Sequence, residues 1–409
     1  MKKVLIFLVL NIFILYSGTA GGFQVSMHSQ QNVGMGLTGT SLYTSSSSIF
    51  YNPGALSMQQ DNFSFSLGAS LLYSNVAYKG ADPTLYKAQT DNPLNFPFYF
   101  YGSKRLGKRF VLGVGVYTPY GSSMRWEDGW NGRYIIQNTS LTTIFIQPTL
   151  SAKIGKKIGL GIGLIYALGN FEQNNALPVS SLSMPDGNVA MKGSARNWGF
   201  NAGILVRPVK KLSVGLNFRS AVKLVIKGGD AVFTVPVSLT DQFPASNRFN
   251  TTIPLPANIN LGAHYEISEF WLITLQIDYT LWNIYDTTSI DFSKNTESLA
   301  DQRIANNYKG NFAFRIGTQY IHKKLIYRAG AYVDIPPSDK NHINPQNPGM
   351  TQLGLSAGIS ICPLKYIGID ISYLFVYSFP RSGNFQPYEF AGTYKGITHI
   401  PGLGLSIKF

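Results

Sequence analysis

The sequence has little charge, a single cysteine and, beyond its amino terminus, no long apolar run. Only 13% of its 409 residues are charged, about half the usual share for a soluble domain. Its aromatic share of 13% excludes a disordered chain. The mean hydropathy of +0.02 is too low for a bundle of membrane helices. A glycine- and aromatic-rich chain with these absences is typical of a large all-β protein, and of an outer-membrane barrel in particular.

Metal and cofactor chemistry has little support in the sequence. Cys362 has no partner for an internal disulfide and no Cys/His spacing typical of a metal site surrounds it. The five histidines are far apart in sequence: His28, His264, His322, His342 and His399. We therefore expect no metal and no cofactor.

The net charge of +14 raises the question of an acidic partner. The basic residues are scattered, and no basic stretch is interleaved with a nucleic-acid motif, so we expect no nucleic-acid partner. A basic protein fits better beside the phosphates of lipopolysaccharide, or as one that attracts an acid.

The first twenty residues are typical of a secretory signal peptide. Lys2 and Lys3 precede a short apolar stretch, residues 4–16, and Gly18-Thr19-Ala20 supplies small residues for cleavage. This predicts a signal peptide over 1–20 and a mature chain from Gly21. No later window is apolar enough for a membrane helix, so an exported chain either stays soluble or crosses a membrane as strands.

Period-two alternation is the strongest signal in the remaining sequence. In 353–361 leucine, alanine and isoleucine alternate with glycine and serine, and 366–376 and 158–168 behave alike. The apolar set suits lipid and the small polar set suits a lumen. These stretches run for 10 to 20 residues, whereas strands of soluble sandwiches have about 5–6 residues.

The pattern predicts fourteen antiparallel strands, an even number as bacterial barrels require. Their expected ranges are 62–78, 93–105, 109–120, 139–155, 157–173, 192–208, 211–229, 253–268, 270–292, 308–322, 325–336, 350–362, 365–378 and 396–409. Short and long connections alternate throughout, with long ones at 79–92, 121–138, 174–191, 230–252, 293–307, 337–349 and 379–395. Tight periplasmic turns and long outer loops produce this rhythm. The sequence predicts a transmembrane β-barrel over 61–409 in the bacterial outer membrane.

The two ends of the mature chain differ from the strands between them. Residues 21–60 are small and polar and do not alternate, which leaves a free periplasmic tail or a lumenal plug. A fourteen-strand lumen would leak if empty, so we favour an amino-terminal hatch over 21–60. The chain ends on Phe409, which resembles the terminal signal that barrel assembly machinery reads, and this predicts that machinery as a partner.

The ordered set of motifs resembles the FadL/TodX family of outer-membrane long-chain fatty-acid and hydrocarbon transporters. The match begins at Gly21-Gly22-Phe23-Gln24 and includes Asn52-Pro53-Gly54-Ala55, similar to the family's Asn-Pro-Ala hatch motif with glycine in third place. Further matching stretches are 118–121, 130–134, 215–220, 255–257, 278–282, 314–317 and 328–330. The resemblance covers nearly the whole mature chain in one order.

The resemblance implies a mechanism for hydrophobic small molecules. It implies capture at outer loops, a lumenal pocket beside the mature amino terminus where Phe23 contacts the ligand, and sideways exit at a kinked third strand. It also implies a hatch or gate that includes Asn52, Pro53 and Gly54. Gly113 or Gly115 could supply the kink; alternatively, these glycines only face a crowded lumen.

Two outer loops carry the apolar residues that capture would need. Loop 174–191 contains Val179 and Leu182, and loop 230–252 contains Phe233 and Phe243. Contiguous exposed apolar residues indicate a binding site. Alternatively, the two loops pack on each other as a cap, and the two interpretations are compatible.

Strand parity turns three arginines toward the lumen, namely Arg219, Arg315 and Arg328. One of them is a candidate to bind a carboxylate head group. The inward Asp278, Asp334 and Asp370 are their candidate ion-pair partners, which would give them a structural role.

Three other functions compete with transport of hydrophobic compounds. A general porin would need a charged constriction and an open channel. A structural or adhesive barrel would need no lumenal pocket. A lipid hydrolase would need a Ser/His pair, yet no GxSxG motif is present, and we expect no enzyme.

Overall fold

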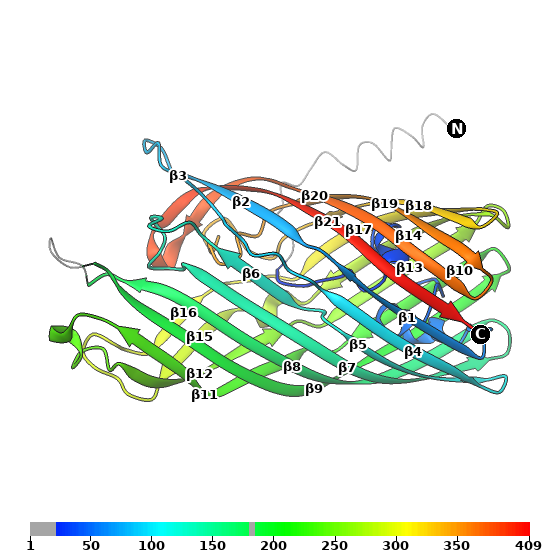
Figure 1. Cartoon of the computed structure of the whole chain (residues 1–409), viewed down its shortest axis with the longest axis horizontal. Helices are drawn as coiled ribbons and strands as arrows, with labels where there is room; N and C mark the ends of the chain where they lie inside the picture. Colours follow the sequence, from blue (N-terminus) through cyan, green and yellow to red (C-terminus); the bar gives the residue numbers. More distant parts are fainter. Residues whose placement is uncertain (1–21, 180–184) are drawn as a thin grey trace.

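The computed structural model describes residues 22–179 and 185–409, which leaves the predicted signal peptide and Leu182 outside the described residues. Over these ranges, twenty-one strand segments form one antiparallel sheet that closes into a fourteen-strand barrel (Figure 1). Closure is made by β1 against β21, from Ser64 opposite Lys408 to Ser70 opposite Gly402. The predicted all-β fold, a fourteen-strand antiparallel barrel, is confirmed.

Several barrel strands consist of two segments. In chain order the fourteen are β1 (Phe63–Ser70) with β2 (Tyr73–Gly80); β3 (Lys87–Gln89) with β4 (Phe98–Leu106); β5 (Phe110–Tyr117) with β6 (Gly121–Arg125); β7 (Asn138–Ile154); β8 (Ile158–Leu177); β9 (Gly187–Val209); β10 (Leu212–Arg219) with β11 (Val222–Thr234); β12 (Ser246–Leu255) with β13 (Asn258–Glu266); β14 (Trp271–Thr280) with β15 (Thr287–Phe292); β16 (Gln302–Ala305) with β17 (Asn311–His322); β18 (Leu325–Asp334); β19 (Gln352–Leu364); β20 (Ile367–Phe385); and β21 (Phe390–Lys408). Three short 3-10 helices lie between strands. They are η1 (Val237–Leu239) after β11, η2 (Trp282–Ile284) after β14 and η3 (Gln386–Tyr388) after β20.

Alternation of side chains divides the wall into an apolar outside and a small or polar inside. On β1, Phe65 and Leu67 are exposed, whereas Ser64 and Ser66 between them are buried. The same division recurs on β20, where Ile369 and Ile371 are exposed. Since a barrel strand shows one face to lipid and the other to the lumen, the period-two pattern of the sequence is the physical basis of this wall.

The outer ends of the strands extend further than the sequence predicted. The expected loop 174–191 is shortened because β8 continues to Leu177 and β9 already begins at Gly187. Likewise β11 runs to Thr234, which places Phe233 in a strand rather than in loop 230–252. Neighbouring strands there pair with each other, for example Leu177 with Gly187, so their backbone groups remain hydrogen-bonded beyond the apolar band.

Residues 22–60, which we call the lumenal segment, lie against the inner wall. The segment contains three one-turn helices, α2 (Gln30–Val33), α3 (Ser48–Tyr51) and α4 (Pro53–Leu56), all buried. Helix α2 contacts β19 and β20, whereas α4 contacts β7, β8, β9 and β10 on another part of the wall. The segment therefore spans the bore, and Figure 1 shows its blue trace inside the barrel.

Candidate functional site

Asn52 ties the lumenal segment to the wall. Its side-chain oxygen accepts a hydrogen bond from the Gly54 amide at 2.8 Å, which caps helix α4. Its amide nitrogen donates to the carbonyl oxygens of Thr40 at 2.6 Å and of Ile204 on β9 at 3.0 Å. One side chain thus joins two parts of the segment to a barrel strand.

Glycines on both sides allow this close approach. A Cβ at Gly54 would lie 2.6 Å from the carbonyl oxygen of Gly203 and 2.8 Å from that of Gly159. A Cβ at Gly203 would in turn overlap the Asn52 side chain. Alanine in the third place of the Asn-Pro-Gly motif would therefore collide with the wall, which explains glycine at this position.

The third barrel strand is interrupted between β5 and β6, at residues 118–120. Both segments pair with β7, but among the described strand pairs only β5 also pairs with β4. At the interruption the strand pairs with the lumenal segment instead: the Val25 amide donates to the Pro119 carbonyl at 2.8 Å, and the Gly121 amide donates to the Phe23 carbonyl at 2.9 Å. Pro119 has no amide hydrogen to offer a neighbouring strand.

The interruption of the third strand does not lie at Gly113 or Gly115, the two positions that the sequence offered for a kink. Gly113 and Gly115 lie in a regular part of β5, paired without a register shift to β4 and β7. Their lack of a side chain has another cause. A Cβ at Gly113 would lie 2.7 Å from Ile49 of the lumenal segment, and one at Gly115 would lie 2.7 Å from Tyr101. They face a crowded lumen, which was the alternative interpretation.

Phe23 lies among aromatic rings beside the interruption. Its ring packs edge-on against Trp282, with a centroid distance of 4.9 Å, and against Tyr285 at 5.7 Å. It also lines an apolar cavity of about 80 Å³ together with Leu141 and Ile253. Phe23 therefore lines a cavity in the lumen, and its contact with a ligand stays a prediction.

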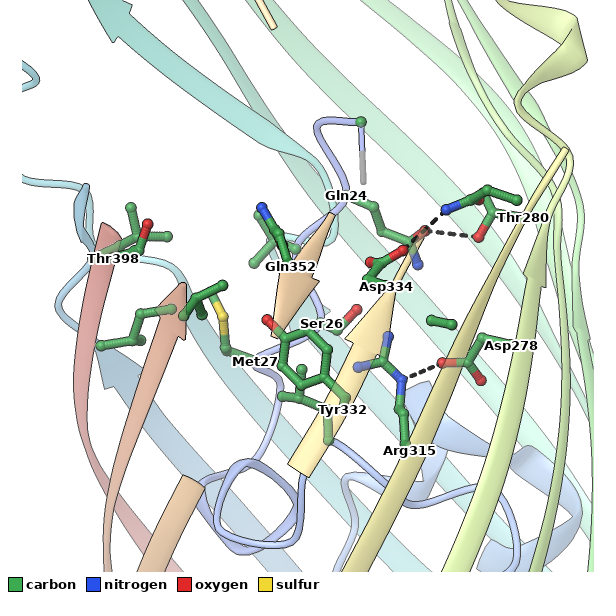
Figure 2. A pocket seen from close by; sticks show the side chains of 18 of the residues that line it. Gln24, Ser26, Met27, Asp278, Thr280, Arg315, Tyr332, Asp334, Gln352 and Thr398 are labelled. Atoms are coloured by element: carbon green, nitrogen blue, oxygen red, sulfur yellow. Dashed lines mark hydrogen bonds and ion pairs between the residues drawn. The ribbon is translucent and has the colours of Figure 1, made fainter. Parts of the chain in front are cut away.

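A second, polar cavity of about 220 Å³ lies beside the lumenal segment (Figure 2). Gln24 borders it, and its side-chain oxygen accepts hydrogen bonds from the amide of Asn258 at 3.0 Å and from the Thr280 hydroxyl at 3.4 Å. Residues Gly22 and Gln24 line the polar cavity while Phe23 lines the apolar one. The extended amino-terminal stretch thus separates two cavities of different chemistry.

Arg315 borders the polar cavity with its charge already compensated. Its Nε donates to the Asp278 carboxylate in a buried ion pair, visible in Figure 2. Its guanidinium also lies over the Tyr332 ring at 5.0 Å. Asp334 lines the same cavity. An incoming carboxylate would meet two acidic side chains here, which disfavours this arginine as a head-group site.

Arg328 lies toward the other end of the lumen, in a different cavity of about 250 Å³. Its Nε donates to the Gln319 side-chain oxygen at 2.8 Å, and Nη1 donates to the Ser360 hydroxyl. Ser360 in turn donates to the Asp370 carboxylate. This chain links the guanidinium to an acid through one hydroxyl.

Arg219 differs from the other two arginines. It is 2% exposed, and no ion pair to it exists among the described residues. Its Nη2 donates to the Phe50 carbonyl at 2.7 Å, and its guanidinium lies 4.0 Å from the centre of the Phe50 ring. Its Nε has no hydrogen-bond partner in the described part of the chain. The structure thus places one buried cation beside an apolar cluster, with no carboxylate paired to it among the described residues.

His28 of the lumenal segment contributes no second charge beside Arg219. Burial, and then the neighbouring Arg219 cation, lowers the pKa of this imidazole to about 3. The ring packs on Phe50 and Tyr117, with centroid distances of 4.2 and 5.3 Å. At neutral pH His28 is therefore uncharged, and Arg219 carries the local positive charge.

The outer apolar residues form a closed cluster rather than an exposed surface. Phe233 and Phe243 are 4% and 8% exposed and pack together with Phe249 and Phe292. Val179 is partly buried against the same cluster. The two loops pack as a cap, the alternative that the sequence analysis left open, because the longer strands carry Phe233 inward.

Several residues of the site had no role predicted from the sequence, although Gln24, Tyr120 and Trp282 lie in the matching stretches. Gln24 forms an antiparallel bridge with Tyr120, and Tyr120 donates from its hydroxyl to the Pro256 carbonyl at 2.8 Å. Trp282 and Tyr285 supply the rings around Phe23. The break in alternation at Thr118-Pro119-Tyr120 was the one local signal that could have located the interruption.

The geometry defines a class of protein: a closed β-barrel with an apolar outer wall, whose bore is filled by its own amino-terminal segment. The particular family follows from comparison. The chain belongs to the outer membrane protein transport protein (OMPP1/FadL/TodX) family, whose model matches residues 12–409. The resemblance found in the sequence is confirmed.

Individual relatives agree with this family. A long-chain fatty acid transport protein of Salmonella typhi is 24% identical over 406 residues, covering 91% of each chain. A FadL homologue of Pseudomonas aeruginosa shares the fold with a TM-score of 0.82 at 16% identity, covering 95% of this chain and all of the other. The toluene transporter TbuX of Ralstonia pickettii gives a TM-score of 0.72 at 15% identity, with coverage of 95% and 100%.

Proposed function

We propose that the protein carries hydrophobic compounds, long-chain fatty acids before hydrocarbons, across the outer membrane without catalysing a reaction. The names of its relatives supply both cargo classes, fatty acids in one case and toluene in another. The observation that favours a fatty acid is Arg219, a buried guanidinium without an acidic partner beside apolar side chains. A hydrocarbon carrier has no need of such a cation.

Capture would begin at the outer cap. Val179, Leu182, Phe233 and Phe243 would offer an apolar surface once the two loops move apart. Each CH₂ group of a long chain that leaves water contributes roughly 0.8 kcal/mol. Capture therefore requires little polar recognition. The lipopolysaccharide of the outer leaflet opposes direct partitioning of the ligand into the membrane, and entry through the cap would avoid this barrier.

The lumenal pocket would lie at Phe23, and Arg219 would bind the carboxylate head group. Phe23 borders the apolar cavity, and the aromatic and aliphatic residues around Arg219 form one continuous cluster with it. Arg315 and Arg328 would keep structural roles, since both already have polar partners in the wall.

Release would occur sideways, at the interruption of the third barrel strand. Only the lumenal segment completes the hydrogen bonding of residues 119–121 on the β4 side within the described structure. Residues 21–60 would act as the hatch, with Asn52, Pro53 and Gly54 as its fixed point on the wall. Movement of residues 22–25 would then open the interruption in the third strand and, at the same time, change the shape of the pocket at Phe23.

The proposal is tested by uptake and by the compounds that the protein retains. Cells that lack the protein should accumulate less labelled oleate than complemented cells, and lipids extracted from the purified protein should be enriched in free fatty acid by mass spectrometry. Equal uptake by both strains would reject transport. Hydrolysis of phospholipid by the purified protein would favour a lipid hydrolase, and surface attachment without uptake would favour an adhesive barrel.

Arg219 provides the test that separates the two cargo classes. Arg219→Met should weaken binding of oleate by about tenfold, the loss of one charge-assisted hydrogen bond, and leave binding of oleyl alcohol unchanged. Arg328→Met is the matched control and should leave both affinities unchanged. If titration gave the Arg219 variant the same affinity for oleate as the unchanged protein, hydrocarbons would become the favoured cargo.

Two further partners belong to this proposal. The Phe409 carboxyl-terminal strand would be read by the barrel assembly machinery, and lipopolysaccharide would surround the outer half of the wall. Deletion of Phe409 should reduce the amount of assembled barrel in the membrane without changing synthesis of the chain.

A further inference from the structure

Positive charge is concentrated at one end of the barrel. Six tight turns join β4 to β5, β7 to β8, β9 to β10, β13 to β14, β17 to β18 and β19 to β20, at the end that also carries the carboxyl terminus (Figure 1). Thirteen basic residues lie in or within three positions of these turns: Lys104, Arg105, Lys108, Arg109, Lys153, Lys156, Lys157, Arg207, Lys210, Lys211, Lys323, Lys324 and Lys365. Only three acidic residues lie at this end of the barrel, Asp61, Glu266 and Glu269.

This basic ring is not neutralised within the protein. None of its thirteen members forms an ion pair with another described residue, and Lys157 and Lys211 donate only to backbone carbonyls. Lys408 at the end of β21 is not a member, because it points into the lumen and donates to the Thr44 carbonyl at 2.9 Å. The loop end is different, because among the described residues it contains ion pairs between exposed side chains: Lys79 with Asp82, Lys192 with Glu172 and Arg248 with Asp230. Since short turns face the periplasm in barrels of this kind, the uncompensated charge lies on the inner-leaflet side.

Neighbouring aromatic side chains place the ring at the level of lipid head groups. Phe110 follows Arg109 directly, and Tyr366 follows Lys365; both rings are exposed on the outer wall, at 48% and 45%. Tyr366 stacks on Phe409 with a centroid distance of 5.9 Å. Aromatic residues of membrane barrels mark the boundary between hydrocarbon and head groups. The turns are short, so their cations remain at this boundary.

We propose that the basic ring binds the phosphate head groups of anionic phospholipids in the inner leaflet of the outer membrane. Five of the six turns carry basic residues, so the charge follows the circumference rather than one side. A lipid annulus contacts the whole circumference, whereas a soluble acidic protein would contact one part of it. The turn between β13 and β14, with Glu266 and Glu269, would be the one gap in the ring.

The test compares two fourfold charge reversals of the full chain, purified from outer membranes. The first combines Lys108→Glu, Lys156→Glu, Lys210→Glu and Lys365→Glu, which lie in four different turns. The matched control combines Lys87→Glu, Lys227→Glu, Lys294→Glu and Lys340→Glu, exposed lysines outside the turns. Native mass spectrometry measures the binding of phosphatidylglycerol relative to phosphatidylethanolamine.

The unchanged protein should prefer phosphatidylglycerol, and the turn variant should lose at least about tenfold of that preference. The control should keep the preference within about twofold of the unchanged protein, because screening by salt limits the reach of distant charges. An equal loss in both variants, or none in the turn variant, would overturn the proposal. A turn variant that kept the preference for phosphatidylglycerol but lost binding to an acidic periplasmic protein would also overturn the proposal.

A second measurement covers the case in which the turn variant fails to assemble. The lipid preference of the unchanged protein should fall as NaCl rises from 50 to 500 mM, since the Debye length shortens from about 14 Å to about 4 Å. A preference that is insensitive to salt would contradict binding by the exposed lysines. Neither measurement depends on the cargo, so failure of this proposal leaves the proposed transport function untouched.

Discussion

Single side chains in the lumen have distinct roles that depend on their partners. Arg315 is paired with Asp278, Arg328 reaches Asp370 through a hydroxyl, and Arg219 has only a carbonyl and a ring. Strand parity predicted that all three point inward, because that is a local property of a strand. Their partners lie on other strands or in the lumenal segment, so the sequence left their roles open.

Phe23 is the residue whose role in binding is most directly testable. Phe23→Ala should weaken binding of a long-chain ligand by about tenfold, because burial of a phenylalanine side chain is worth roughly 1.5–3 kcal/mol. Phe100→Ala, on the lipid-facing side of β4, is the matched control and should leave the affinity unchanged. The measurement is titration with oleate, and an unchanged affinity for the Phe23 variant would remove this ring from the pocket.

At the scale of elements, the fit between helix α4 and strand β9 holds the lumenal segment in place. Gly203 of β9 faces Asn52 without room for another atom. The wall is therefore complementary to the segment in shape, and not simply lined with small residues. Alternation in the sequence predicts a wall of glycine and serine, but it does not indicate which residue of the lumenal segment each glycine contacts.

Gly203→Ala should loosen α4. The added methyl group overlaps the Asn52 side chain, and overpacking of this kind costs typically 1–3 kcal/mol. Amide hydrogen exchange of residues 52–57 should accelerate by about tenfold. Gly102→Ala is the control, since its Cβ would meet only the Phe65 ring at 3.3 Å; comparable exchange in the two variants would contradict the fit described here.

A cross-link between the lumenal segment and the third barrel strand tests the exit route. Gln24 and Tyr120 form an antiparallel bridge, a spacing that suits a disulfide. With Cys362→Ser as background, Gln24→Cys combined with Tyr120→Cys should block oleate uptake under oxidising conditions and restore it on reduction.

The control for this cross-link joins two wall strands. Ala329→Cys with Ala357→Cys, directly opposite on β18 and β19, should leave uptake unchanged in either redox state. Full uptake through the oxidised Gln24–Tyr120 pair would show that release does not require these residues to separate.

At the scale of the whole molecule, lipid surrounds the outer face of the barrel, and the lumenal segment fills its bore. Helices α2 and α4 contact different parts of the wall, so the segment between them crosses the lumen. A filled bore excludes the continuous water column of a general porin. The cap over the outer end, built around Phe233 and Phe243, closes the other side.

The whole protein should therefore give little steady ion conductance in planar bilayers. Removal of residues 22–60 should produce porin-like open channels, because the emptied lumen of a large barrel holds water. Deletion of 237–242 in the outer cap is the control and should leave the conductance low. Large steady currents through the unchanged protein would favour the porin that the sequence analysis kept as an alternative.

The sequence by itself determined the number of strands, their order, the rhythm of tight turns and long loops, and which faces meet lipid. Each of these follows from local rules, since side chains alternate with a period of two and turns require few residues. Tertiary structure decided where the third strand breaks, which arginine lacks an acid, and which glycines admit the lumenal segment. Those properties depend on contacts between residues as distant as Asn52 and Ile204, and no local pattern records which distant residues will meet.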